Sequence, residues 1–153
     1  MVNVGIFRTN YKVDWPFGDI RGGCSPIEFG TSTLIWFFHS VKSLNTTIRD
    51  KTKVYIIGAY ITQNKYPFKI TQMLKQPLLM GIPSPVSRKL LIQDNVVYPC
   101  GAITLDSQTF LISMGINDYK IAHLEVKKDM LRWEKFNYTY KRLTHLDILT
   151  TIS

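Results

Sequence analysis

The chain has 153 residues and a formal net charge of +8, with 45% apolar and 20% charged residues. This length fits one ordinary domain or part of a larger one, and this composition excludes an intrinsically disordered chain. The sequence has no uninterrupted apolar run of the roughly 18 residues that a membrane-spanning helix needs, so no membrane is expected. It also shows no signal peptide at its start, which leaves the localisation unknown and cytoplasmic by default.

The positive charge would suit a polyanion, but the basic residues are spread along the chain. The densest stretch, residues 120–142, is diluted by Glu125, Asp129 and Glu134. No helix-turn-helix pattern, zinc-finger spacing or aromatic-basic signature of an RNA-binding sheet is visible. A solvated basic face is therefore the preferred interpretation, and nucleic acid is not an expected partner.

Short runs rich in β-branched and aromatic residues dominate the chain, and Gly, Pro, Asn and Asp separate them. Such runs predict strands over residues 33–40, 53–63, 89–93, 96–98, 101–105, 109–115 and 119–126. Turn residues at 94–95, 106–108 and 115–118 predict the connections between the later strands. The spacing from Lys89 onward is that of an antiparallel meander.

Two regions interrupt the strand pattern. Residues 64–85 contain four prolines and predict an extended surface connection, with at most a short strand over residues 68–71. Residues 127–136 predict one short helix, and leucines spaced along residues 138–153 allow another. Since no linker divides the chain, we expect a β domain over residues 1–126 and a C-terminal tail, residues 127–153, with a short helix.

The tripeptide Arg21-Gly22-Gly23 and His39 are the first candidates for binding chemistry. Two glycines allow a ligand to approach the backbone beside a guanidinium that donates to phosphates, carboxylates or sugar hydroxyls. Strand alternation puts Phe37 and His39 on one face, opposite Trp36 and Phe38. The alternatives are a plain turn with an exposed arginine and a histidine satisfied within the core.

Two later segments are weaker candidates. In the segment Val96–Gly101, Pro99 ends a strand and Gly101 allows a sharp bend beside Tyr98. Near the end of the last hairpin, Asn117 and Asp118 follow Gly115. The alternative for this pair is a turn in which both side chains cap their own backbone.

The sequence indicates no metal and no cofactor. Cys24 and Cys100 do not form a metal-binding spacing, and we interpret them as two reduced thiols in a packed interior. The three histidines have no ligand spacing either. The sequence lacks a phosphate-binding P-loop, a dinucleotide glycine fingerprint and a nucleophile elbow.

Taken in order, six segments resemble a known family. They are Arg21-Gly22-Gly23 with Pro26, Phe38-His39-Ser40, Tyr55 with Gly58-Ala59-Tyr60, residues 67–70 with 77–79, residues 97–101, and residues 115–118. Their order and spacing resemble the C-terminal half of the mannoside phosphorylases of glycoside hydrolase family 130, which are β-propellers of five blades. The resemblance covers residues 15–126 and is closest to a divergent branch, some members of which occur beside sugar-transferring enzymes.

The resemblance implies an all-β fold: a partial β-propeller of consecutive antiparallel four-stranded meanders, followed by a short helical tail. It also implies a central funnel that binds a sugar or a sugar phosphate. Arg21 and His39 would lie near the phosphate or attacking water, and Asp118 would accept bonds from sugar hydroxyls. Tyr98 and Tyr60 would add to the funnel wall.

Departures from the family pattern leave the activity open. Cys24 stands where relatives tend to have Thr, and Met114 replaces the usual Tyr. The general acid of the family comes from an earlier blade that has no counterpart here, although glycosyl transfer needs a proton for the leaving oxygen. Five blades need on the order of 250 residues, so this chain supplies only two to three of them.

Three functions therefore remain in competition. The first is a glycoside phosphorylase-like or hydrolase-like chain that lacks its catalytic acid, so that activity of the isolated chain is doubtful. The second is a non-catalytic glycan-binding or assembly module associated with a glycosyltransferase, and the third is a basic polyanion-binding protein. Because an incomplete propeller exposes strand edges, self-association or a partner chain carrying the missing half is expected.

Overall fold

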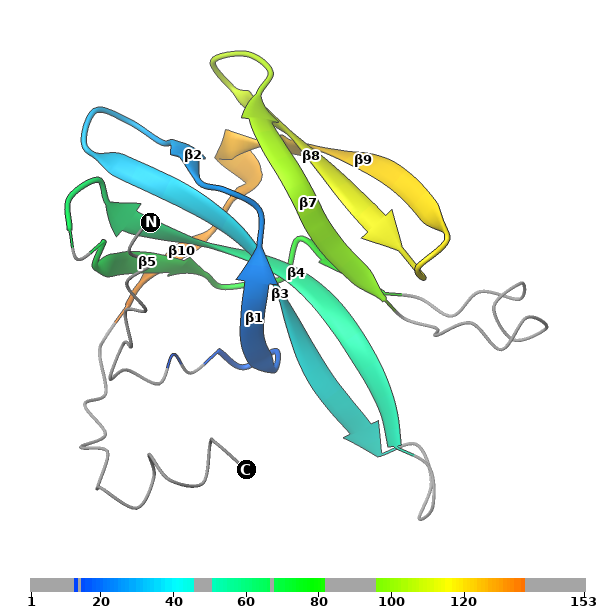
Figure 1. The fold of residues 1–153 in the computed structure, drawn as a ribbon. Helices are drawn as coiled ribbons and strands as arrows, with labels where there is room; N and C mark the ends of the chain where they lie inside the picture. Colours follow the sequence, from blue (N-terminus) through cyan, green and yellow to red (C-terminus); the bar gives the residue numbers. More distant parts are fainter. Residues whose placement is uncertain (1–12, 14, 46–50, 67, 82–95, 137–153) are drawn as a thin grey trace, which may run out of the picture. The chain divides into compact units, whose positions relative to one another are not determined.

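The computed structural model describes residues 13, 15–45, 51–66, 68–81 and 96–136 (Figure 1). Residues Trp15–Phe136 form one compact unit. Its elements are β1 (Asp19–Gly23), β2 (Ile27–Glu28), β3 (Thr33–Asn45), β4 (Lys51–Gln63), β5 (Ile70–Leu74), β6 (Leu79–Met80), β7 (Val97–Thr104), β8 (Thr109–Ile116), β9 (Lys120–Lys127), the 3-10 turn η1 (Lys128–Met130) and β10 (Trp133–Lys135). Within the described residues, no helix is long and apolar enough to cross a membrane.

The strands form two antiparallel sheets. Sheet A has the order β1-β3-β4-β5-β10, with β2 beside β3 and β6 beside β4, and sheet B has the order β7-β8-β9. The all-β class and the antiparallel pairing are thus confirmed. The longer strands of sheet A form a four-stranded meander, β1-β3-β4-β5, and sheet B is a meander of three strands.

The long hairpin of β3 and β4 organises sheet A. Its register is uninterrupted from Thr33 opposite Gln63 to Asn45 opposite Lys51. β-Branched and aromatic residues suit this pleated surface, and successive side chains alternate between its two faces. Phe37 and Ala59 lie opposite each other on the inner face, which packs against sheet B, while Trp36 and Tyr60 lie on the outer face.

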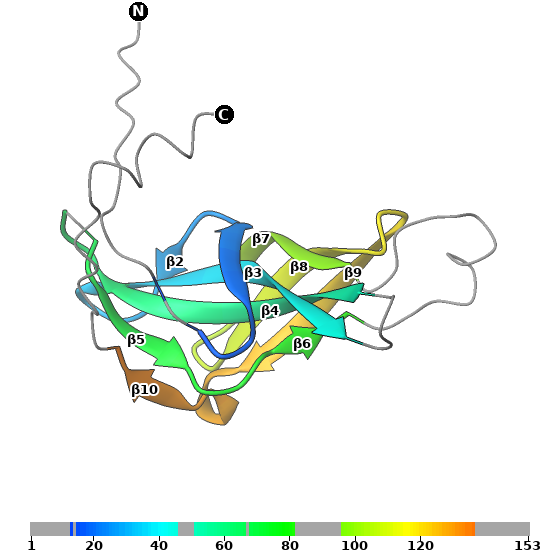
Figure 2. The same cartoon turned by 90° about the horizontal axis from the view of Figure 1, so that it is seen from below.

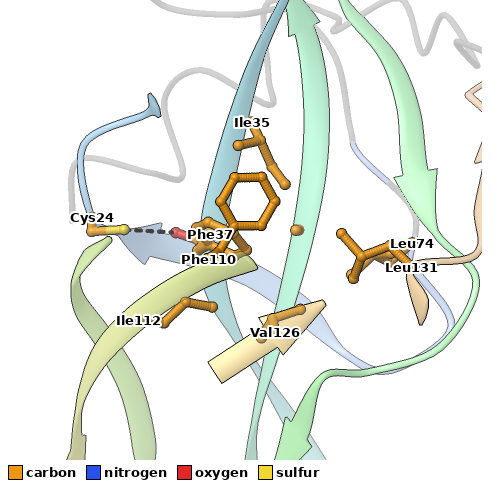
Figure 3. Close-up of a cluster of buried hydrophobic side chains, with 9 residues drawn as sticks. Cys24, Ile35, Phe37, Leu74, Phe110, Ile112, Val126 and Leu131 are labelled. Carbon is orange, nitrogen blue, oxygen red and sulfur yellow. Dashed lines mark hydrogen bonds between the residues drawn. The ribbon is translucent and has the colours of Figure 1, made fainter. Parts of the chain in front are cut away.

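The core between the sheets is a cluster of buried side chains from both (Figure 3). The rings of Phe37 in β3 and Phe110 in β8 meet edge to face at 5.7 Å, and both are at most 1% exposed. Cys24, Ile35, Leu74, Ile112, Val126 and Leu131 complete the cluster with Ala59. A smaller cluster of Ile57, Val97 and Met114 continues this contact.

The predicted hairpins of sheet B are confirmed. β7 and β8 are joined through residues 105–108, where the Asp106 carboxylate accepts a hydrogen bond from the Gln108 backbone N–H at 2.7 Å. β8 and β9 are joined through residues 117–119, and Asn117 and Asp118 both adopt positive φ angles. The predicted strands over residues 96–98 and 101–105 form one strand, β7, with a bulge between Pro99 and Gly101. The strand expected over residues 89–93 and the turn at 94–95 lie outside the described residues.

Two sequence predictions need correction. Residues 127–136 do not form a helix, because only a 3-10 turn, η1, precedes the short strand β10, which pairs with β5. Leu131 and Trp133 join the core from this segment, so burial of their side chains in sheet A overrides the helical pattern. The connection over residues 64–85 also contains more strand than expected, because β5 and β6 both pair with β4. The possible helix over residues 138–153 lies outside the described residues.

Candidate functional site

A β-bulge in β1 shapes the first part of the candidate site. Ile20 pairs with Ser40 and Gly23 pairs with Phe38, so Arg21 and Gly22 together lie opposite the single residue His39. A bulge of this kind leaves one residue without a ladder partner and turns side chains away from their regular direction. The bulge therefore places Arg21 and His39 beside each other on neighbouring strands.

The two glycines have different roles in the bulge. A Cβ on Gly23 would lie 1.9 Å from the carbonyl oxygen of Phe37, so β1 can approach β3 only because this residue has no side chain. A Cβ on Gly22 would meet no atom within 4 Å. The backbone beside Arg21 is therefore open to a ligand, while the next residue is locked against the sheet.

The surroundings of His39 favour its neutral form. Burial of the ring lowers the pKa of His39, a hydrogen bond with the Gly22 backbone opposes this shift, and the nearby Arg21 charge adds to it. Arg21 is exposed and His39 is half-buried. An anion can therefore reach the pair from solvent and accept hydrogen bonds from it.

Tyr55 in β4 supports the His39 ring from the side. The two rings stack with centroids 5.9 Å apart and planes 20° from parallel. Tyr55 also packs against the cluster of Ile57, Val97 and Met114. The stacking fixes the orientation of the imidazole and connects the bulge to the contact between the two sheets.

Tyr60 belongs to a different surface. It lies on the outer face of sheet A, opposite to the face of His39, and it stacks on Trp36 with planes 17° apart. Burial raises the pKa of Tyr60 to about 12. Phe38 and Phe68 extend this row of rings on either side. The structure therefore does not bring Tyr60 together with Arg21 and His39.

Tyr98 and Asp118 both come from sheet B. Tyr98 lies opposite Gly115, and its ring fills the space where a Cβ on this glycine would be, with the Tyr98 ring carbon only 2.4 Å away from that position. Asp118 is exposed in the turn between β8 and β9. No contact that the structure gives for Asp118 joins it to Arg21 or His39, and their convergence on one ligand stays a prediction.

Asn117 is the buried member of its turn. Its side-chain amide oxygen accepts a hydrogen bond from the Val96 backbone N–H at 2.9 Å, and the Asn117 backbone N–H donates to the Val96 carbonyl at 2.8 Å. The side chain thus anchors the start of β7, 21 residues away in sequence. Turn chemistry alone does not indicate this long-range anchor, and of the two turn residues Asp118 is the one that faces solvent.

The described residues provide no obvious proton donor for glycoside cleavage. Their carboxylates, listed here in full, are all exposed: Asp19, Glu28, Asp106, Asp118, Glu125, Asp129 and Glu134. A general acid of this reaction class normally sits in surroundings that raise its pKa. The same part of the chain contains no cluster of three or more His, Cys, Asp or Glu residues that could hold a metal.

The two cysteines differ from each other, which corrects the expectation that both are packed inside. Cys24 is buried in the core, and burial raises the pKa of its thiol. Cys100 is exposed at the bulge of β7. Proline on one side and glycine on the other end the regular ladder there, so the side chain between them points to solvent.

Sequence reasoning selected Arg21 and His39 as candidates but did not place the residues that contact them. Tyr55 was part of the recognised pattern, yet only the register of β3 and β4 places it beside His39. The alternation of side chains puts Tyr55 and Ile57 on one face of β4 and Ile56 on the other, but this local pattern does not say which residue of β3 lies beside Tyr55. Comparisons with protein-family models, with curated proteins and with solved structures found no match to this chain.

Proposed function

We propose that this chain is a carbohydrate-binding β module, related to the sugar-binding half of a propeller, that holds a sugar or sugar phosphate without cleaving glycosidic bonds by itself. The observation that carries the proposal is the bulge that sets Arg21 beside His39, next to the open backbone of Gly22. The resemblance to mannoside phosphorylases supports the ligand class, and the meander of sheet A is compatible with a propeller blade.

The chemistry of this pair favours a phosphate-bearing sugar over a neutral one. Arg21 supplies a fork of N–H donors that matches two phosphate oxygens, and His39 supplies a further donor when a bound anion favours the protonated ring. The Tyr55 ring, stacked on His39, adds an apolar surface of the kind that sugars contact. The exposed setting of all described carboxylates argues for binding rather than catalysis.

The proposal is tested by titrating the protein with mannose 1-phosphate, mannose and inorganic phosphate in a calorimeter. We expect mannose 1-phosphate to bind most tightly, with a dissociation constant on the order of 1 mM, as suits a small exposed site. Arg21→Ala should weaken this binding at least about tenfold, which corresponds to the roughly 1.4 kcal/mol of one charge-assisted contact.

Arg132→Ala provides the matched control. Arg132 is also exposed, and its guanidinium donates to the backbone oxygen of Asp129, so the variant makes the same charge change away from the bulge. Wild-type affinity in Arg132→Ala and lost affinity in a folded Arg21→Ala support the proposal. Equal losses in both variants would indicate general charge attraction, and no binding of mannose 1-phosphate to the wild-type chain would refute a sugar-phosphate site.

A further inference from the structure

In the part of the chain that the structure describes, the outer strand of sheet B has an unpaired edge, and one hydrogen bond shows which of its residues point toward that edge. The Lys128 backbone N–H donates to the Gln108 carbonyl at 2.8 Å, and this pair continues the register in which Thr109 lies opposite Lys127. In an antiparallel ladder, hydrogen-bonded and non-hydrogen-bonded pairs alternate. The even-numbered residues of β9 therefore bond to β8, and the odd-numbered residues direct their N–H and C=O groups away from it.

Four consecutive odd positions form this edge: Ile121, His123, Glu125 and Lys127. All four side chains are exposed, and Ile121 is 82% exposed. Within the described residues β9 pairs only with β8 and is the last strand of sheet B (Figure 1). An edge of this length with unpaired backbone groups is a template for another strand.

We propose that β9 is a homodimer interface, at which β9 of a second copy pairs antiparallel and joins the two three-stranded sheets into one continuous sheet. The proposal does not depend on the sugar site. Charge complementarity along the strand selects this occupant, because β9 carries both signs of charge at positions that a two-fold axis can bring together.

Of the registers that overlap nearly the whole of β9, only one is complementary, because pairing Glu125 with Lys127 about an axis at Val126 would leave most of the strand unpaired. With the two-fold axis at Leu124, each His123 lies opposite Glu125 of the other copy, and each Ile121 lies opposite Lys127. These odd-numbered pairs are the ones whose backbone groups point toward the partner, as the ladder requires. Moving the register by two residues in one direction puts His123 opposite His123, which loses the pair with Glu125. Moving it in the other direction puts Glu125 opposite Glu125, and like charges directly opposite each other are destabilising.

The same register also matches the inner face. Leu124 would meet Leu124 of the second copy in a non-hydrogen-bonded pair, the type in which side chains are closest. Ala122 would lie opposite Val126. These residues already face the core between the sheets, with Leu124 half-buried and Val126 buried. The pairing would therefore extend the apolar layer of sheet B without burying an unpaired charge.

Sedimentation equilibrium of the full chain tests the interface, with one substitution aimed at the backbone. His123→Pro removes an N–H that points away from β8, so it should leave the sheet intact and abolish the dimer. His123→Thr keeps the N–H and suits a strand, and it should remain dimeric with at most about a tenfold weaker association, since it loses the cross-strand charge pair. A wild-type chain that is monomeric at every accessible concentration would overturn the proposal, and so would a folded His123→Pro variant that is still dimeric.

A charge exchange tests the register even if His123→Pro does not fold. Glu125→Lys puts a lysine opposite His123 of the second copy and should weaken the dimer by about tenfold or more. Adding His123→Glu restores an opposite pair at both symmetric positions, so the double variant should recover the dimer. Failure of this rescue would overturn the register, because in the shifted registers the double variant puts equal charges opposite each other. An edge covered by a segment of the same chain would leave all these variants monomeric and would also overturn the proposal.

Discussion

The outer faces of the two sheets are built differently. The two sheets share one core, and Figure 2 shows the strands of sheet B crossing the β3–β4 hairpin of sheet A. Each sheet has a second face directed away from this core. On sheet A the second face is closed: Trp15 covers it and contacts Phe38, which is 2% exposed, with ring centroids 5.0 Å apart. On sheet B the second face is open: Ile103 is 56% exposed and Ile121 is 82% exposed.

The covered outer face of sheet A therefore stabilises the fold, whereas the open outer face of sheet B is accessible to other molecules. The Trp15 indole N–H donates to the Leu74 carbonyl at 3.0 Å, which holds the cover on sheet A in place. Gly58 makes room for it, because a Cβ there would lie under 3 Å from the rings of Phe38 and Trp15. Sheet B has no comparable cover within the described residues. We therefore expect sheet A to contribute more to stability and sheet B to contribute more to association.

The largest expected effect is a difference in the free energy of unfolding between two variants, each with one residue of an outer face replaced by alanine. Phe38→Ala should lower the free energy of unfolding by about 3–5 kcal/mol, because it removes a fully buried ring and leaves a cavity against Trp15. Ile103→Ala should change it by no more than about 0.5 kcal/mol, because its side chain is already largely in water. Urea denaturation of both variants measures the difference. A cost for Ile103→Ala similar to that of Phe38→Ala would show that the outer face of sheet B is covered after all.

A second comparison uses the two bulges, one in each sheet. Gly23→Ala should cost about 1–3 kcal/mol or more, because its Cβ would overlap the backbone of Phe37 and push β1 off the sheet. Gly101→Ala, in the bulge of β7, should be neutral or stabilise by up to about 1 kcal/mol, because a Cβ there meets no atom within 4 Å. Thermal unfolding of the two variants tests this order, and equal destabilisation would contradict it.

The smallest expected effect is the pH dependence of stability that His39 contributes in sheet A. The pKa of His39 is lowered in the folded protein, so the unfolded chain takes up this proton at a higher pH than the folded chain does. The contribution to stability is therefore complete above the ordinary value of 6.5 and is lost as the pH falls through 6.5 toward the lower folded pKa. His39→Gln should flatten the dependence of the melting temperature on pH in this range.

Arg132→Ala, which removes an exposed charge away from the bulge, serves as the control for this measurement. It should retain the wild-type slope. If the slope persists in His39→Gln and disappears in Arg132→Ala, the assignment of the pH dependence to the bulge is wrong.

Much of the fold was predictable from local sequence. Turn residues predicted both hairpins of sheet B, and the β-branched and aromatic runs predicted β3, β4, β7, β8 and β9, whereas the short strands β1, β2, β6 and β10 were not predicted. Strand alternation correctly separated Phe37 and His39 from Trp36 and Phe38. The resemblance selected Arg21 and His39 as a pair, and the structure places them beside each other, whereas it separates Tyr60 from them.

The sequence by itself determined the positions of turns, the alternation of side chains along each strand and the glycines that the bulge needs. These features depend on backbone preferences and on the two-residue period of a strand, which act over a few neighbouring residues. Only the tertiary structure decided that Asn117 anchors Val96, that β10 joins β5 instead of forming a helix, and that sheet A is covered while sheet B is open. The physical reason is that burial and hydrogen-bond partners depend on which distant strand lies opposite, and no local pattern contains this information.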